Sequence, residues 1–72
     1  MPYVNIKVTD EGVTKEQKRD LIKGVTSLLE TVLDKDPSTT HVVIDEVGLD
    51  NWGLGGVQVR EYREAEARKR GN

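Results

Sequence analysis

Residues 14–33 read TKEQKRDLIKGVTSLLETVL, and this stretch has the pattern of a long amphipathic helix. Thr14 is a favourable N-cap residue, and Gln17 three positions later completes a capping box. At about 100° per residue, the apolar side chains that follow fall within one arc of the helix. They are Leu21, Ile22, Val25, Leu28, Leu29, Val32 and Leu33. The pattern therefore predicts a helix that runs to about residue 33 and has a single apolar face.

Two segments with strand character flank this helix. Residues 3–8 alternate between polar and apolar side chains, which is the period of two expected of a strand. Residues 40–47 carry the consecutive apolar run 42–44, which is typical of a strand covered on both faces. Residues 34–39 form a loop, because Pro37 prevents continuation of the helix. The order strand, long helix, strand predicts a βαβ unit with parallel strands and a right-handed crossover.

The C-terminal third of the chain has a different composition. Residues 48–56, GLDNWGLGG, are rich in turn formers, and their glycines fit a hairpin better than a phosphate loop, since no Gly-Lys-Ser/Thr signature is present. Residues 57–59 are predicted to be a short strand in that hairpin. Residues 60–72 form a charged tail, either a short solvated helix or disordered, and we expect it to be partly ordered. We treat residues 1–72 as a single domain.

Size and composition favour self-association. The chain has 72 residues and no cysteine, so disulfides and thiolate metal sites are excluded as sources of stability. A zinc site is not expected either, because His41 is the only histidine. One helix covers one face of a sheet, and the other face needs a partner. Oligomerisation is therefore the expected way for this small domain to gain a core.

The charge balance and the hydropathy pattern limit which other classes of partner are expected. With 11 Lys and Arg against 13 Asp and Glu, the net charge is −2, which argues against a general nucleic-acid binder. No apolar run approaches the length that spans a bilayer, so we expect no membrane partner. The start, MPYVNIKV, has no basic segment followed by an apolar one, as a signal peptide would have. We therefore expect a cytoplasmic protein.

Four motifs in order make the sequence resemble the 4-oxalocrotonate tautomerase family over roughly residues 2–60. They are MPYVNIKV at 1–8, EGVTKEQKRDLI at 11–22, VVIDE at 42–46 and NWGLGG at 51–56. The resemblance implies an α+β fold: a compact, two-layer β-α-β subunit with parallel strands and a C-terminal hairpin. It also implies a homo-oligomer, assembled as a hexamer or a trimer of dimers. Such an assembly agrees with the unpartnered sheet face argued above.

The resemblance implies a catalytic role for Pro2. Members of the family lose the initiator Met, so that the proline becomes the amino terminus and offers a secondary amine as general base. Burial in an apolar pocket lowers the pKa of such an amine and keeps it unprotonated nearer neutrality. The implied activity is that of a cofactor-independent isomerase, a tautomerase that moves a proton in a 1,3 keto–enol transfer on a small enol or 2-oxo acid. The alternative is that Pro2 only begins a strand.

Two further residues are candidates for substrate binding through the resemblance. Trp52 stands at the position of the family's active-site aromatic, where an indole beside Pro2 would form an apolar wall between subunits. The alternative is an aromatic of the core or of a subunit interface. His41 stands where well-known members carry an arginine. It can donate one hydrogen bond but cannot reproduce the bidentate fork of Arg, and it can equally be an ordinary strand residue.

The sequence departs from the family at a second arginine position, where it has Val13, which cannot bind a carboxylate. Arg60 and Arg63 near the C-terminus are candidates to replace the lost cation, although arginines in a tail are more often solvated. We therefore expect a less charged enol or keto substrate than the family's usual dicarboxylate, and weak activity on standard family substrates.

Two other functions stay open. The first is a hydratase or dehalogenase in which a protonated terminal amine acts with a carboxylate, for which the chain offers Asp45, Glu46 and Asp50. The second is a non-catalytic oligomeric binding module on the same fold. The loss of both arginines is the best support for this second reading.

Overall fold

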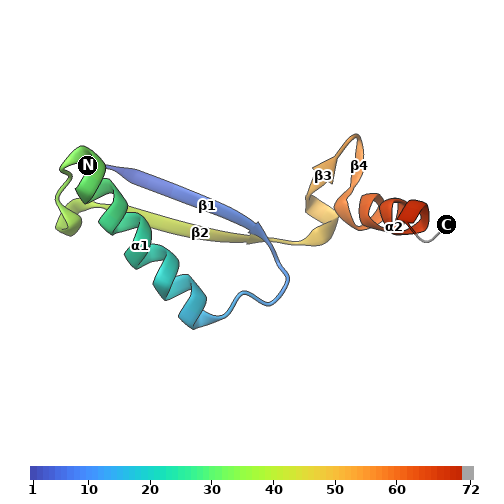
Figure 1. The fold of residues 1–72 in the computed structure, drawn as a ribbon, viewed down its shortest axis with the longest axis horizontal. Helices are drawn as coiled ribbons and strands as arrows, with labels where there is room; N and C mark the ends of the chain where they lie inside the picture. The colour runs from blue at the N-terminus through green and yellow to red at the C-terminus, as the bar shows by residue number, and fades with distance from the viewer. Residues whose placement is uncertain (71–72) are drawn as a thin grey trace.

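The computed structural model describes residues 1–70, in which a βαβ unit is followed by a hairpin and a second helix (Figure 1). In the first unit, strand β1 spans Tyr3–Thr9, helix α1 spans Lys15–Leu33 and strand β2 spans His41–Val47. The two strands pair in parallel along their whole length, from Tyr3 opposite His41 to Thr9 opposite Val47. The predicted βαβ unit is thus confirmed.

Helix α1 begins with the predicted capping box. The backbone N–H of Gln17 donates to the Thr14 hydroxyl at 3.1 Å, and the Gln17 side-chain oxygen accepts from the Thr14 N–H at 2.9 Å. These two bonds satisfy donors that the first turn of a helix leaves free. The helix ends after Leu33, where Asp34 adopts a left-handed conformation with φ 55° and its N–H bonds the carbonyl of Glu30.

The connection from α1 to β2 contains a short 3₁₀ turn, η1, over Pro37–Thr39. The Asp36 carboxylate caps this turn by accepting from the Ser38 N–H at 2.9 Å. Thr40 closes the turn, since its N–H bonds the Pro37 carbonyl at 3.3 Å. Strand β2 therefore begins at His41, one residue later than the sequence predicts.

After β2 the chain makes a tight hairpin between strands β3 (Gly53–Leu54) and β4 (Val57–Gln58), preceded by a 3₁₀ turn, η2, at Leu49–Asn51. Gly55 and Gly56 have φ values of 65° and 86°, and two successive positive values are what a type I′ hairpin turn requires. The predicted hairpin is confirmed.

Helix α2 spans Val59–Arg70, which makes the described part of the predicted charged tail helical. The prediction of residue 59 as part of a strand is wrong, because Val59 begins this helix and buries its side chain at the helix start. Residues 71–72 of the predicted tail lie outside the described part of the chain.

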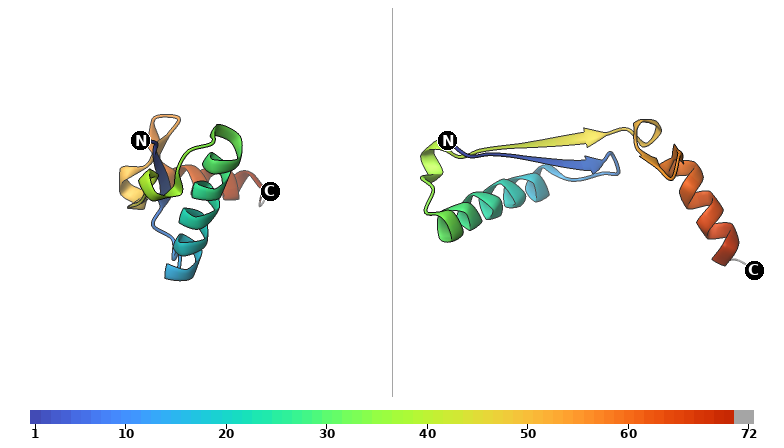
Figure 2. Two further views of the ribbon diagram at one scale, coloured as in Figure 1. Left: turned by 90° about the vertical axis from the view of Figure 1, so that its left-hand side faces the viewer. Right: turned by 90° about the horizontal axis from the view of Figure 1, so that it is seen from above.

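The sheet has one covered and one uncovered face. Helix α1 runs along one side of β1 and β2 (Figure 2). The ion pair between Lys18 of α1 and Glu46 of β2, 2.8 Å long, identifies the face that the helix covers. Because side chains alternate along a strand, Val43 and Tyr3 belong to the opposite face. They are 41% and 64% exposed. Among residues 1–70 no element covers this second face (Figure 2).

A single chain does not close a core. Within residues 1–70 only Val59 is buried. The radius of gyration is 16.6 Å and the principal extents are 51 × 24 × 20 Å, because the hairpin and α2 project beyond the end of the sheet (Figure 1). A compact domain of this length has a radius of gyration of about 11 Å. The extended shape leaves large apolar side chains in water, which is typical of a subunit that associates.

Candidate active site

Pro2 and His41 lie side by side at the N-terminal end of the parallel sheet. Pro2 is half-buried and immediately precedes β1, and its carbonyl oxygen accepts from the backbone N–H of His41 at 3.0 Å. The next residue, Tyr3, is the register partner of His41. Parallel pairing thus brings together two of the three site residues predicted from the sequence, 39 positions apart, and leaves the His41 side chain exposed.

Trp52 lies at the opposite end of the sheet. It follows η2, beyond the C-terminal end of β2, whereas Pro2 precedes β1 (Figure 1). Because the strands are parallel, seven residues of strand separate the two ends, a distance of about 20 Å. Val13, in the connection from β1 to α1, is also at the Trp52 end. One chain alone therefore does not place the indole beside Pro2.

Trp52 is held by its own hairpin. Its carbonyl oxygen accepts from the Val59 N–H at 2.7 Å, and its residue is half-buried. A shallow recess at this end of the sheet is lined by Lys7, Val47, Asn51, Trp52 and Gly53. The recess is open, so Trp52 presents a surface that a second chain can meet.

Asp45 occupies the middle of the sheet face that α1 leaves uncovered. Its carboxylate accepts from the Asn5 side-chain amide at 2.9 Å and from the Lys7 ammonium at 2.9 Å. These contacts, with the Asn5 hydrogen bond as the larger cause, hold the pKa of Asp45 below its ordinary value. The carboxylate is ionised and already partnered.

The other two carboxylates considered for positioning water are also paired. Glu46 lies 2.8 Å from the Lys18 ammonium on the opposite sheet face, and Asp50 lies 3.6 Å from the Arg60 guanidinium. None of the three carboxylates adjoins Pro2 in the strand register. None of these three carboxylates is therefore placed to activate water beside the proline of its own chain.

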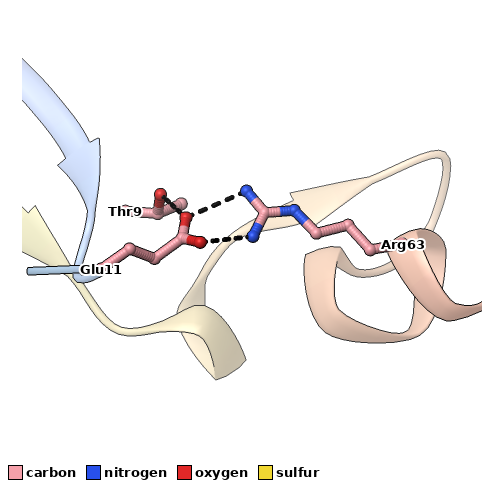
Figure 3. A network of polar contacts seen from close by, with 3 residues as sticks. All are labelled: Thr9, Glu11 and Arg63. Atoms are coloured by element: carbon pink, nitrogen blue, oxygen red, sulfur yellow. Dashed lines mark hydrogen bonds and ion pairs between the residues drawn. The ribbon is translucent and has the colours of Figure 1, made fainter.

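The two tail arginines are engaged at the Trp52 end of the molecule. Arg63 of α2 makes a bidentate ion pair with Glu11, with N–O distances of 2.6 and 2.9 Å (Figure 3). The Thr9 hydroxyl also donates to the Glu11 carboxylate (Figure 3). Arg63 and Thr9 together lower the pKa of Glu11 from 4.5 to about 2, and Glu11 raises the pKa of Arg63.

The contact between Glu11 and Arg63 was not predicted from the sequence. Glu11 stands in a family-like motif and Arg63 in a charged tail, 52 positions away. Local charge patterning detects pairs that are three or four residues apart on a helix, and it carries no information at such a separation. Neither Arg60 nor Arg63 is near Pro2 of its own chain.

No cluster of three or more His, Cys, Asp or Glu side chains within residues 1–70 is arranged to hold a metal ion. No helix in that range combines the length and the apolar character needed to cross a bilayer.

Comparison with known proteins gives a consistent result. A family model described as "Tautomerase enzyme" matches residues 2–62. The protein named probable tautomerase K2 of Dickeya dadantii (strain 3937) is 59% identical over 64 residues, which cover 89% of this chain and 96% of that protein. The crystal structure of DmpI from Helicobacter pylori aligns with a TM-score of 0.82 and 46% identity, covering 88% of this chain and 97% of that one.

A more distant structural relative is described as an oligomer. It is a heterohexamer 4-oxalocrotonate tautomerase from Chloroflexus aurantiacus, with a TM-score of 0.76 and 26% identity, covering 85% of this chain and 97% of that one. The family model covers Pro2, the βαβ unit and the hairpin that carries Trp52. This chain therefore belongs to the tautomerase family.

Proposed function

We propose that this protein catalyses a 1,3 keto–enol proton transfer on a small enol or 2-oxo acid, with the nitrogen of Pro2 as general base. Membership of the tautomerase family, together with a proline immediately before β1, is the observation that carries the proposal. The reaction is an isomerisation, so it needs no group donor: the amine accepts the proton of the enol hydroxyl and returns a proton to carbon as the carbonyl forms.

The chemistry requires that Met1 be removed. While Met1 is attached, the Pro2 nitrogen is part of a tertiary amide, whose lone pair is delocalised into the carbonyl and accepts no proton at neutral pH. After removal it is a secondary amine. Its position stays defined, because the hydrogen bond from His41 to the Pro2 carbonyl does not involve the nitrogen. A base anchored to a sheet in this way loses little freedom when substrate binds.

We propose that His41 contributes a hydrogen bond to the substrate. Its side chain is exposed at the same sheet end as Pro2, and Val13 offers no polar group. One imidazole supports one carboxylate or carbonyl oxygen, and it lacks the rigid fork with which Arg holds a carboxylate. A substrate with a single carboxylate, such as an enolpyruvate bearing an apolar substituent, fits this site better than a dicarboxylate.

The proposed site is completed by a second copy of the chain. About 20 Å of strand separates Pro2 from Trp52 within one subunit, so the indole can wall the pocket only of a neighbouring subunit. The uncovered sheet face, with Tyr3 and Val43 exposed, supports such an association. We propose a homo-oligomer, a hexamer or a trimer of dimers, which is the size of the related heterohexamer.

Ketonisation of phenylenolpyruvate tests the function. Intact mass is measured first, and the mature protein is expected to lack Met1. The variant Pro2→Ala is expected to lose about 100-fold in kcat, the lower part of what a positioned general base contributes. Pro37, the only other proline, lies in η1 and gives a matched control, Pro37→Ala, expected to retain activity. Equal rates for Pro2→Ala and the wild type would favour the non-catalytic binding module instead.

A further inference from the structure

Residues 48–70, here called the C-terminal module, form a unit with its own contacts. The Val59 N–H bonds the Trp52 carbonyl at 2.7 Å, the Gln58 side chain donates to the Asp50 carbonyl at 3.0 Å, and Arg60 pairs with Asp50 at 3.6 Å. Val59, the buried residue, also belongs to this unit. Trp52 is therefore fixed to α2, and any rotation of the module carries the indole with it.

The C-terminal module has a narrow connection to the βαβ unit. It continues covalently from Val47, and its elements project beyond the sheet end (Figure 2). Among residues 1–70, the Glu11–Arg63 ion pair is the single side-chain polar contact that joins the module to residues 1–47. A unit tethered at one covalent point can pivot, and a second contact away from that point restricts the pivot.

The geometry of the Glu11–Arg63 ion pair is suited to restricting rotation of the C-terminal module. Two guanidinium nitrogens meet two carboxylate oxygens at 2.6 and 2.9 Å, an arrangement that fixes the plane of both groups (Figure 3). The hydroxyl of Thr9, the last residue of β1, holds the carboxylate from the sheet side. The contact thus links the end of the sheet to the second turn of α2.

We infer that the Glu11–Arg63 pair is a positioning contact, which sets the orientation of the C-terminal module and with it the placement of Trp52 against the neighbouring subunit's Pro2. This inference rests on the proposed function, in which Trp52 walls a shared site. Arg63 is not assigned a catalytic role here, since both of its terminal guanidinium nitrogens are engaged by the Glu11 carboxylate. It acts through the indole.

Trp52 provides a direct readout, because it is the only tryptophan in the chain. The variants Arg63→Ala and Glu11→Gln each remove the pair. Both are expected to shift the Trp52 emission maximum, to increase its quenching by acrylamide, and to lower kcat/KM for phenylenolpyruvate about three-fold, an effect of the size that a surface ion pair exerts. The loss is expected in KM rather than in kcat, since the base is untouched.

Two further variants serve as controls. Arg68→Ala removes another arginine of α2, one whose side chain bonds the Glu64 carbonyl of the same helix, so it is expected to leave both the emission and kcat/KM at wild-type values. The charge-reversed double variant, Glu11→Arg with Arg63→Glu, is expected to recover the wild-type emission. Circular dichroism and oligomer mass show that each variant is folded and assembled.

Unchanged Trp52 emission in both Arg63→Ala and Glu11→Gln would overturn the inference, as would an equal shift in Arg68→Ala. A shifted emission with unchanged kcat/KM would overturn the link to the active site. A separate result would show that the proposed function is wrong, namely wild-type activity in Pro2→Ala. In that case the emission of the Arg63→Ala and Glu11→Gln variants still decides whether the pair orients the module.

Discussion

The backbone N–H of His41 donates a 3.0 Å hydrogen bond to the carbonyl oxygen of Pro2, and this bond begins the parallel ladder between β1 and β2. It orders the start of the chain, a region that is loose in most proteins. Because both partners are backbone groups, the position of Pro2 relative to His41 does not depend on the histidine side chain. A change in the His41 side chain should therefore leave the position of Pro2 intact.

The first prediction uses that separation of backbone and side chain. In His41→Ala the KM for phenylenolpyruvate is expected to rise about ten-fold, the value of one hydrogen bond to a charged group, with kcat within about two-fold of the wild type. Steady-state kinetics measure both constants. Ser27→Ala, an exposed change on α1, controls for nonspecific effects. If KM does not change, His41 is an ordinary strand residue.

The second prediction concerns a site shared between subunits. Pro2→Ala and Trp52→Ala are each expected to lose activity, because each removes one contribution to every site. When the two purified variants are unfolded together and reassembled, random mixing leaves about one quarter of the sites with both residues intact. The rate of ketonisation is expected to recover in proportion. If native mass spectra show mixed oligomers and activity still does not recover, the two residues do not share a site.

The third prediction addresses the sheet face that α1 leaves uncovered. Val43 is 41% exposed on that face in one chain. In Val43→Asp a carboxylate would be buried without a partner at the proposed interface, which is strongly unfavourable. The variant is expected to dissociate and to lose most of its thermal stability. Light scattering coupled to size-exclusion chromatography measures the mass.

The matched control for this interface is Ser27→Asp on the exposed side of α1, which is expected to assemble normally. A Val43→Asp protein that keeps the wild-type mass would show that the oligomer forms through another surface.

The fourth prediction is a pH dependence of stability. The ion pair with Arg63 lowers the pKa of Glu11 from 4.5 to about 2, so the folded state binds a proton less readily than the unfolded state. The stabilisation is therefore complete above pH 4.5 and is lost as the pH falls toward 2. The difference in unfolding temperature between the wild type and Glu11→Gln should be constant near neutrality and shrink through this window.

Other carboxylates do not obscure this comparison. Asp36 and Asp45 also have lowered pKa values, through hydrogen bonds from Ser38 and from Asn5 and Lys7 respectively. Both are present in the wild type and in the variant, so their contributions cancel in the difference. If the difference in unfolding temperature stays constant down to pH 2, ionisation of Glu11 does not stabilise the folded state.

Local sequence determined most of the secondary structure. Thr14 and Gln17 mark the start of α1 through their capping box, and the apolar positions up to Leu33 give its length. Gly55 and Gly56 define the hairpin turn, since both adopt positive φ. Pro2 is identified for a similar reason, because its proposed role begins with its place directly after Met1. Each of these features is read over a few neighbouring residues.

Tertiary structure decided how the site residues are distributed. Parallel pairing puts His41 beside Pro2 and carries Trp52 to the far end of the sheet, because strands that run the same way share their N-terminal ends. The pairing of Glu11 with Arg63 arises where β1 ends and α2 begins, across 52 positions of sequence. Local sequence patterns cannot predict the positions of these site residues or the Glu11–Arg63 pair, since both depend on which distant segments the fold brings into contact.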